Sequence, residues 1–445
     1  MTMDTPLPNP GLRAGILILL LGLLSADGWA LELTRGPYLQ RGTSDSIIIR
    51  WRTDLPSESV VRYGGSPAGL THTTNSRALT TEHEVLVTGL AADTRYFYAV
   101  GSSGRVLAGG DSDHFFTTSP PAGAPAGTRI WVLGDSGTAD DDAQAVRDAY
   151  LGYPGHGDTD LVLMLGDNAY SSGQDAEYQE AVFDIYPTVL RSRVLWPAMG
   201  NHDGYGSESR TQTGPYFDIF SLPRRGQAGG VPSGTEAYYA FDYANIHFIC
   251  LDSYGSSRSP SGPMLTWLRR DLAATSRQWI IVYWHHPPYT MGRYNSDTGK
   301  RMTEMRRNVL PILDEYSVDL VLNGHSHAYE RSFLLDGHYG PSATLTEGMI
   351  LDGGDGREDG DGPYTKISGA PHQGVVYVVA GSAGETIDGM RHHPVMYSSL
   401  AELGSLILDI DGNRLDATFL QADGSVGDHF TIIKNTGKAL AHSAN

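Results

Sequence analysis

The order of apolar and polar residues divides the chain near residue 120. From about residue 32 to 118, apolar and polar side chains alternate in short segments separated by turn residues. In 45–53 the apolar side chains fall on one face and Arg50 and Arg52 on the other, as in a half-buried strand. This part of the chain is therefore predicted to be an all-β sandwich.

After residue 128 the pattern changes to continuous apolar runs that alternate with helical periodicity. Such runs are typical of strands that are buried in an α/β sheet. Strands are expected within 129–135, 161–167, 278–284 and 319–325, helices at 141–151, 175–186, 264–274 and 306–316, and a hairpin around Asp-Gly at 406–420. The segment 119–128 is rich in Pro, Gly and Ala and lacks periodicity, so it is predicted to be a linker.

The length of 445 residues exceeds the usual size of one domain. Residues 1–30 are predicted to be a secretory signal peptide, because Arg13 precedes an apolar core at 14–25; an N-terminal membrane anchor is the alternative. After cleavage, no transmembrane span is expected. The predicted layout is a signal peptide at 1–30, a β domain at 32–118, a linker at 119–128 and an α/β domain at 129–435.

Composition narrows the class of protein. The single cysteine, Cys250, allows no internal disulfide, and for a protein exported by the predicted signal peptide this favours a bacterial secreted or periplasmic protein over a eukaryotic secreted one. The formal net charge of -19 excludes a broad basic surface, so nucleic acid is not expected as a partner. An anionic substrate is still possible, because a bound metal ion can dominate the local field. The oligomeric state is not predicted.

Five of the apolar segments end in clusters of metal-binding residue types. The clusters are GDSG at 134–137, GDNAY at 166–170, GNHD at 200–203, VYWHH at 282–286 and GHSHAYER at 324–331. The carboxyl ends of strands in an open sheet converge on one crevice, and a glycine before a ligand lets the backbone turn sharply. A single cluster would indicate only a turn or a satisfied polar residue, but five in order predict a metal site.

The set of residue types indicates which metal site this is. Two aspartates, one asparagine, three histidines and a tyrosine are too many for one tetrahedral zinc ion. They favour two metal ions that share a bridging carboxylate, and the absence of cysteine disfavours soft metals. Two metals about 3.5–4 Å apart are typical of in-line displacement at phosphorus.

These five blocks, in this order, resemble the calcineurin-like metallophosphoesterases and, within them, the purple acid phosphatases. The tyrosine of GDNAY and the AYER tail carry the narrower resemblance. RGPYLQ at 35–40 and the segment 89–100, with Tyr96 at a tyrosine-corner position, are similar to a fibronectin type III-like domain; any other small β-sandwich is the alternative. The resemblance spans about 32–435. It implies a four-layer α-β-β-α metallophosphoesterase sandwich, preceded by the all-β domain.

The resemblance also implies roles for individual residues. The first metal would be held by Asp135, Asp167, Tyr170 and His327, and the second by Asp167, Asn201, His285 and His325. The tyrosine favours Fe(III) at the first position, and the second ion would be Fe, Zn or Mn. Metal-bound hydroxide would attack the phosphorus of a small phosphate monoester, with His202 as the acid for the leaving group and Asn201 also contacting substrate. Asp203 is expected to orient His202.

Two positions need separate arguments. The family pattern places a ligand three residues after Val282, which is His285. Strand alternation would point His286 away from His285, so His286 is expected to make a supporting hydrogen bond behind the ligands. Relatives commonly offer a further histidine in the next loop, where this chain has Tyr294, with Arg293 beside it. Tyr294 is therefore predicted to contact substrate in its place.

Three functions remain open from the sequence. The first is an acid phosphatase that hydrolyses monoesters, and the second is a phosphodiesterase or nucleotidase of the same fold. The third, from a different class, is a catalytically dead surface-binding or adhesion protein.

Overall fold

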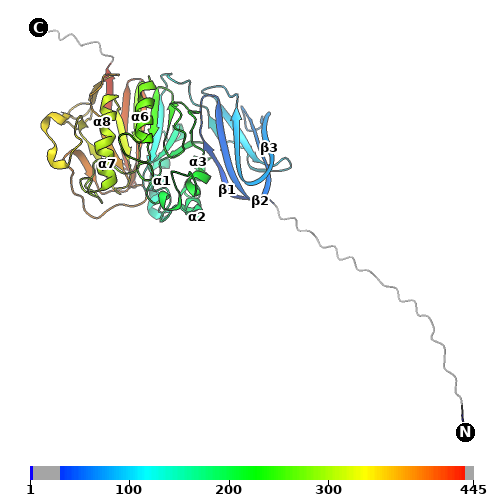
Figure 1. The fold of residues 1–445 in the computed structure, drawn as a ribbon. Helices are drawn as coiled ribbons and strands as arrows, with labels where there is room; N and C mark the ends of the chain where they lie inside the picture. Colours follow the sequence, from blue (N-terminus) through cyan, green and yellow to red (C-terminus); the bar gives the residue numbers. More distant parts are fainter. Residues whose placement is uncertain (4–30, 436–445) are drawn as a thin grey trace. The chain divides into compact units, whose positions relative to one another are not determined.

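The computed structural model describes residues 1–3 and 31–435, and from Glu32 onward the chain forms one compact unit (Figure 1). The predicted signal peptide at 1–30 lies outside the described residues, apart from its first three. Within the described residues, no helix is long and apolar enough to cross a membrane.

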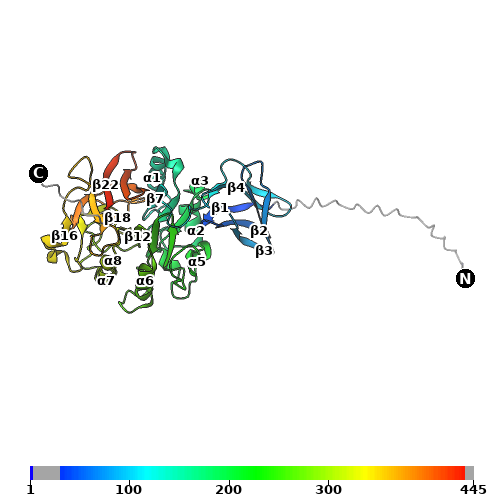
Figure 2. The same cartoon turned by 90° about the horizontal axis from the view of Figure 1, so that it is seen from above.

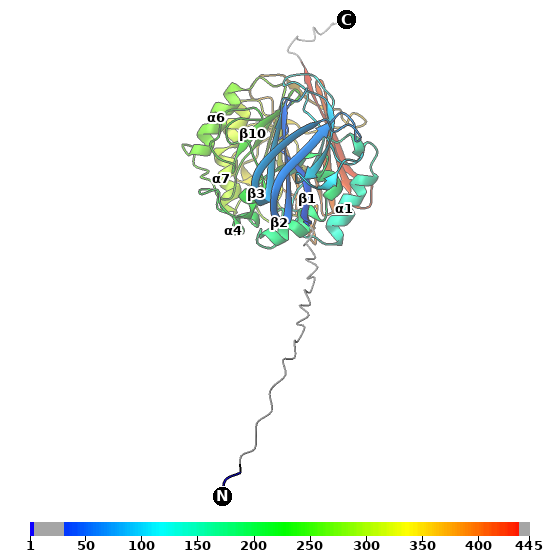
Figure 3. The ribbon, with the colours of Figure 1, turned by 90° about the vertical axis from the view of Figure 1, so that its right-hand side faces the viewer.

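Six antiparallel strands form the N-terminal part. Strand β2 pairs with β1, β3 and β4, and β4 pairs with β5 and β6 (Figure 3). The strands are β1 (Leu33–Gln40), β2 (Ser46–Gly64), β3 (His72–Thr88), β4 (Arg95–Gly101), β5 (Val106–Gly109) and β6 (Phe115–Thr117). The hydroxyl of Tyr96 accepts a hydrogen bond from the Ala91 N–H at 3.0 Å, the contact typical of a tyrosine corner. The predicted β-sandwich is thus present.

The arginine face of β2 is less exposed than its alternating pattern suggests. Arg50 is buried, because its guanidinium donates to the Asp218 carbonyl at 2.6 Å and to the Ser221 hydroxyl at 3.1 Å. Strand β1 also pairs in parallel with β9 at Leu39 and Val194. One sheet therefore continues from the N-terminal strands into the α/β part, which the sequence pattern did not predict.

The α/β part contains two large sheets. The first orders its strands β17-β22-β21-β20-β7-β8-β9 and continues to β1, and the second orders them β10-β11-β12-β13-β18-β14-β19. The strands of the first sheet are β7 (Thr128–Leu133), β8 (Leu161–Met164), β9 (Val194–Pro197), β17 (Tyr364–Ile367), β20 (Gly404–Asp411), β21 (Arg414–Gln421) and β22 (Val426–Asn435). Those of the second are β10 (Tyr239–Tyr243), β11 (Ile246–Cys250), β12 (Trp279–Tyr283), β13 (Leu320–Asn323), β14 (Tyr329–Ser332), β18 (Val376–Ala380) and β19 (Met396–Leu400), and β15 (Leu334–Leu335) pairs separately with β16 (Ile350–Asp352).

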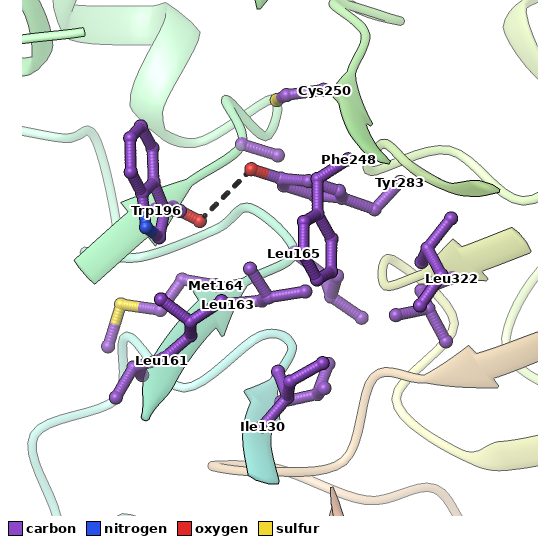
Figure 4. Packing of buried hydrophobic residues seen from close by; sticks show 14 of the residues in the cluster. Ile130, Leu161, Leu163, Met164, Leu165, Trp196, Phe248, Cys250, Tyr283 and Leu322 are labelled. Atoms are coloured by element: carbon purple, nitrogen blue, oxygen red, sulfur yellow. Dashed lines mark hydrogen bonds between the residues drawn. The ribbon is translucent and has the colours of Figure 1, made fainter. Parts of the chain in front are cut away.

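Apolar side chains from both sheets pack together in the core. Figure 4 draws Leu163 of the first sheet and Phe248 and Leu322 of the second among the side chains of this core, and all three are fully buried. The Tyr283 hydroxyl donates to the Trp196 carbonyl at 3.4 Å, which links the two sheets directly. Helix α1 lies on one side of the sheets and α6, α7 and α8 on the other (Figure 2). The predicted α/β fold with four layers is therefore confirmed.

Helices are present where the sequence predicts them at 141–151 and 264–274, whereas the helix predicted at 175–186 is one α-helical turn followed by a π turn. The helices are α1 (Asp141–Gly152), α2 (Asp175–Tyr178), α3 (Pro187–Leu190), α4 (Asp203–Gly206), α5 (Pro215–Ile219), α6 (Pro263–Ala274), α7 (Lys300–Asn308) and α8 (Leu310–Glu315), with a π turn at Gln179–Phe183 and short 3-10 turns at His156–Asp158, Ser342–Thr344 and Glu347–Met349. The single helix expected at 306–316 is divided at Val309. Pro311 has no N–H and its ring is tolerated only in the first turn of a helix, so a new helix begins there.

A buried ionic cluster holds β10, β11 and α6 together. His247 lies between two carboxylates, with its Nδ1 2.7 Å from Asp242 Oδ1 and its Nε2 2.8 Å from Asp271 Oδ2. Arg277 also binds Asp242, at 3.1 Å. Burial lowers the pKa of His247, but the hydrogen bonds to Asp242 and Asp271 outweigh burial and raise it to about 9. The histidine is therefore a buried cation near neutral pH.

His247 should make stability depend on pH. A pKa raised in the folded state gives stabilisation that is complete below the unfolded value near 6.5 and is lost as pH rises through about 9. The contribution is about 3 kcal/mol at most. In urea unfolding at pH 6, the wild type should have a larger free energy of unfolding than His247→Gln. This difference between the two proteins should become smaller by pH 9.5. A difference that stays constant over this range would contradict a charged His247.

Candidate metal centre

The seven predicted ligands all follow the carboxyl ends of strands. Strands β7, β8 and β9 are parallel to one another, and so are β12 and β13 in the second sheet. Asp135 follows β7, Asp167 and Tyr170 follow β8, Asn201 follows β9, His285 follows β12, and His325 and His327 follow β13. Their side chains contact one another in two groups.

The backbone at these strand ends is tightly turned. Four of the seven ligand residues have left-handed backbone, with φ of 56° at Asp135, 53° at Asp167, 71° at His325 and 38° at His327. A Cβ atom on Gly166 would lie 2.8 Å from His285 Nδ1, and one on Gly324 would lie 2.4 Å from Asp135 Oδ2. These two glycines are required because the ligand side chains approach the backbone so closely.

The first group consists of Asp135, Tyr170 and His327. The Tyr170 hydroxyl lies 3.3 Å from Asp135 Oδ1 and 3.2 Å from His327 Nε2, and that nitrogen lies 3.4 Å from Asp135 Oδ1. Burial, and then the charges of Asp135 and Asp167, raise the pKa of Tyr170 well above its ordinary value. Three potential ligand atoms thus face a common point.

The second group consists of Asp167, Asn201, His285 and His325. His285 Nε2 lies 3.2 Å from each of three atoms: Asp167 Oδ2, Asn201 Oδ1 and His325 Nδ1. Ligand atoms of Asp167, His285 and His325 lie within 4.8 Å of one another, and all three residues are buried.

The chemistry of the second group requires a cation. His285 Nδ1 donates to the Leu165 carbonyl at 3.0 Å, so in the neutral ring Nε2 carries a lone pair. That lone pair faces oxygen atoms of Asp167 and Asn201, which are acceptors as well. Burial lowers the pKa of His285, but Asp167 and then Asp135 raise it above its usual range. The protein therefore favours positive charge at this point, and a metal ion can take the place of the proton.

His286 lies behind this group and has a different partner. Its Nδ1 lies 2.9 Å from the Ser253 hydroxyl, which also accepts from the His286 backbone N–H at 3.0 Å. Its ring packs against that of His325, with centroids 4.4 Å apart. Strand β12 ends at Tyr283, before either histidine, so strand alternation does not explain why the two rings point in different directions. Their hydrogen-bond partners explain it, because His285 is bonded to the Leu165 carbonyl and His286 to the Ser253 hydroxyl.

His202 lies at the exposed side of the centre. Its Nε2 is 3.9 Å from Asp167 Oδ2, its Nδ1 is 2.5 Å from the Ser171 carbonyl, and its side chain is 29% exposed. The Ser171 carbonyl accepts a hydrogen bond from Nδ1, which leaves Nε2 facing the centre.

Asp203 does not orient His202, which corrects the prediction. It is fully buried and accepts hydrogen bonds from the Gly200 N–H at 2.8 Å and from the Asn168 side chain at 3.1 Å. The Tyr178 hydroxyl also donates to it, at 2.5 Å. Asp203 therefore connects the two loops that carry Asp167 and Asn201.

Tyr294 lies beside the second group. Its ring stacks on His325 with centroids 4.1 Å apart and an angle of 6° between the planes. Tyr294 thus lies next to a residue of the second group, and its contact with substrate stays a prediction.

Glu385 and Ser171 are neighbours of the centre that the sequence did not predict. Glu385 Oε2 lies 3.0 Å from His327 Nδ1, and its Oε1 lies 3.2 Å from the Arg293 guanidinium. The Arg293 guanidinium lies closer still, 2.7 Å from His327 Nδ1, and donates to that nitrogen, while Nε2 of His327 faces Asp135 and Tyr170. No motif marks either residue, because each contributes a single atom from an irregular loop.

Comparison with known proteins agrees with this geometry. Residues 128–329 match the family model described as calcineurin-like phosphoesterase, and residues 36–118 match the purple acid phosphatase N-terminal domain. The solved structure of purple acid phosphatase PPD1 from yellow lupin (Lupinus luteus) seeds superposes with a TM-score of 0.67 at 16% identity, over 90% of this chain and 75% of that one.

Curated relatives are similar over part of their length. Purple acid phosphatase 15 of Arabidopsis thaliana is 28% identical over 278 residues, which cover 56% of this chain and 49% of the relative. The purple acid phosphatase of Glycine max is 27% identical over 64% of this chain and 62% of its own. The chain thus spans about half to two thirds of the length of these relatives.

The fold and the strand-end loops are those of the calcineurin-like phosphoesterases, whose family model matches residues 128–329. Within that class, residues 36–118 match the N-terminal domain of the purple acid phosphatases, and the curated relatives are purple acid phosphatases.

The two adjacent histidines should differ in their effect on metal binding. His285→Ala removes the nitrogen at the middle of the second group, so bound metal should fall from two equivalents towards one. His286→Ala removes a ring whose nitrogen is already bonded to Ser253, so two equivalents should remain. Metal analysis of both purified variants, with circular dichroism as the control for folding, measures the difference. The reverse pattern would shift the assignment by one residue.

Proposed function

We propose that the chain is an exported enzyme that hydrolyses phosphate monoesters at a centre of two metal ions. The observation that carries the proposal is the convergence of two groups of ligand atoms at the strand ends, in a chain whose curated relatives are purple acid phosphatases. Asp135, Asp167, Tyr170 and His327 would hold the first ion, and Asp167, Asn201, His285 and His325 the second.

The electrostatics of Asp167 support its place between the two ions. Its charge raises the pKa of His285 in the second group, and it also acts on Tyr170 in the first. Burial raises the pKa of Asp167 itself, but the neighbouring His285 outweighs this and lowers it. A carboxylate that stays ionised while buried is suited to bridge two cations.

The chain's own residues position the substrate and move a proton. When bound, the two ions supply the Lewis acidity that activates water and neutralises charge on the phosphoryl oxygens. Asn201 directs its carbonyl oxygen toward His285, which leaves its amide N–H groups to donate to a phosphoryl oxygen. Ser171 holds Nδ1 of His202, so Nε2 delivers a proton to the oxygen of the leaving group. Tyr294 contacts the substrate at the edge of the second group.

The finer assignments are part of the same proposal. A phenolate ligand at Tyr170 favours Fe(III) in the first position, and Fe, Zn or Mn occupies the second. The apolar segment at 14–25 supports export of the protein. The Tyr96 corner supports a fibronectin type III-like N-terminal domain at 32–118, followed by the catalytic domain at 129–435.

Substrate turnover and metal content test the proposal together. The purified protein should contain two metal equivalents, one of them iron, and should hydrolyse p-nitrophenyl phosphate with a higher kcat/KM than bis(p-nitrophenyl) phosphate. Faster hydrolysis of the diester would identify a phosphodiesterase. A protein that holds two metals and hydrolyses neither ester would indicate a binding protein instead.

His202 should be needed for protonation and not for metal binding. His202→Ala should keep two metals and lose about 10²–10⁴-fold in kcat, the usual contribution of a positioned general acid. The loss should be smallest for esters with acidic leaving groups, because these depart without a proton. Measurement of kcat across a series of phenyl phosphates tests this. An equal loss for every ester would show that His202 binds phosphate instead.

A further inference from the structure

Three tyrosines surround the candidate metal centre, and the mechanism above uses only one of them. They come from separate segments: Tyr205 lies on α4, Tyr254 follows β11, and Tyr294 follows β12. Each ring is next to a histidine of the site. Tyr205 contacts His202 with centroids 5.2 Å apart, Tyr254 is parallel to His286 at 6.4 Å, and Tyr294 stacks on His325 at 4.1 Å.

Within residues 31–435, the hydroxyl groups of these tyrosines have no role in holding the fold together. In the part of the chain that the structure describes, none of the three hydroxyls makes a hydrogen bond, whereas the buried Tyr38 and Tyr98 donate to backbone carbonyls. Tyr205 is 59% exposed and Tyr294 is 37% exposed. One exposed aromatic side chain is ordinary, but exposed rings gathered around a catalytic centre indicate contact with a ligand.

Tyr205 is held in a fixed position although it is exposed. Its ring meets that of Tyr254 edge to face, with centroids 6.2 Å apart and an angle of 81°. The Arg301 guanidinium covers Tyr254, 4.5 Å from its centroid. Tyr254 therefore supports Tyr205 from behind, and its own cation contact limits its movement.

The position of His202 decides which part of a substrate meets Tyr205. In the proposed reaction, the oxygen of the leaving group takes its proton from His202 Nε2. The group bonded to that oxygen must then lie beside His202, where the Tyr205 ring is the adjacent surface. A planar ring attached directly to the ester oxygen can reach the face of Tyr205, whereas a small alkyl group presents little surface to it.

We propose that Tyr205, supported by Tyr254, binds the aromatic ring of the leaving group, so that aryl phosphate monoesters are the preferred substrate class. The inference rests on the proposed phosphatase function and on His202 as the proton donor. A nucleoside monophosphate offers the same planar chemistry, but its ring is separated from the ester oxygen by a sugar. The ring would then lie beyond Tyr205.

The ratio of two turnover rates tests this inference. Phenyl phosphate is compared with an alkyl phosphate whose alcohol is about as acidic as phenol, so that leaving-group chemistry is matched. In Tyr205→Leu, the aryl to alkyl ratio of kcat/KM should fall by about 3- to 10-fold, the range expected for one aromatic contact. Tyr205→Phe keeps the ring and should keep the ratio. Tyr397→Leu, which changes a tyrosine that is also partly exposed and covered by Arg331, is the matched control and should keep it as well.

Binding of inhibitors separates this inference from the proposed function. By calorimetry on the metal-loaded protein, Tyr205→Leu should weaken phenylphosphonate about 3- to 10-fold more than methylphosphonate. This result would stand even if the wild type hydrolysed neither ester, in which case only the phosphatase function would fail. An unchanged ratio and unchanged phosphonate selectivity in Tyr205→Leu would overturn the role of Tyr205. A larger loss for adenosine monophosphate than for phenyl phosphate would overturn the aryl class in favour of nucleotides.

Discussion

The main constraint on this structure is that several buried hydrogen-bond acceptors at the candidate metal centre face one another. Around His285 Nε2, a carboxylate oxygen, an amide oxygen and a second imidazole nitrogen all lie at 3.2 Å. Acceptors this close, away from water, are stable only with positive charge among them. The left-handed backbone of Asp135, Asp167, His325 and His327, and the glycines that precede the first three, bring the atoms together. The rigid two-sheet core must hold that strained backbone in place.

A surrounding layer of hydrogen bonds determines which atom of each ligand faces inward. The Leu165 carbonyl accepts from Nδ1 of His285, and the Arg293 guanidinium donates to Nδ1 of His327. Asp203 holds the loops on either side of Asp167, through Gly200 and Asn168. Each ring has two nitrogens of similar basicity, so its orientation depends on these partners and not on its place in the sequence. The same principle explains why His286, bonded to Ser253, differs from its neighbour.

The sequence predicted the strands and the ligand clusters well, and the partners of the ligands poorly. A buried strand followed by residue types that bind metals leaves a local pattern, and five such patterns in order predict one crevice. Ser171, Ser253 and Glu385 leave none, because each supplies one atom across a distance that only the folded chain determines. The prediction for Asp203 failed for a related reason. Adjacency to His202 in sequence suggested contact, but at the start of α4 the carboxylate turns inward, toward Gly200 and Tyr178.

The contacts of the N-terminal strands explain how a separate β part bears on the centre. Arg52 and Arg35 bind Asp175, the first residue of α2, at 2.6 and 3.2 Å. Two residues further on, Glu177 accepts hydrogen bonds from the backbone N–H groups of Ser171 and Ser172, at 2.8 and 3.0 Å.

The Ser171 carbonyl in turn holds Nδ1 of His202. Charged hydrogen bonds, one turn of α2 and backbone hydrogen bonds thus connect the arginines of β1 and β2 to the nitrogen opposite the proposed proton donor. Hydrogen bonds to charged groups are directional and stronger than neutral ones, so this connection ties the segment that holds His202 to the N-terminal strands.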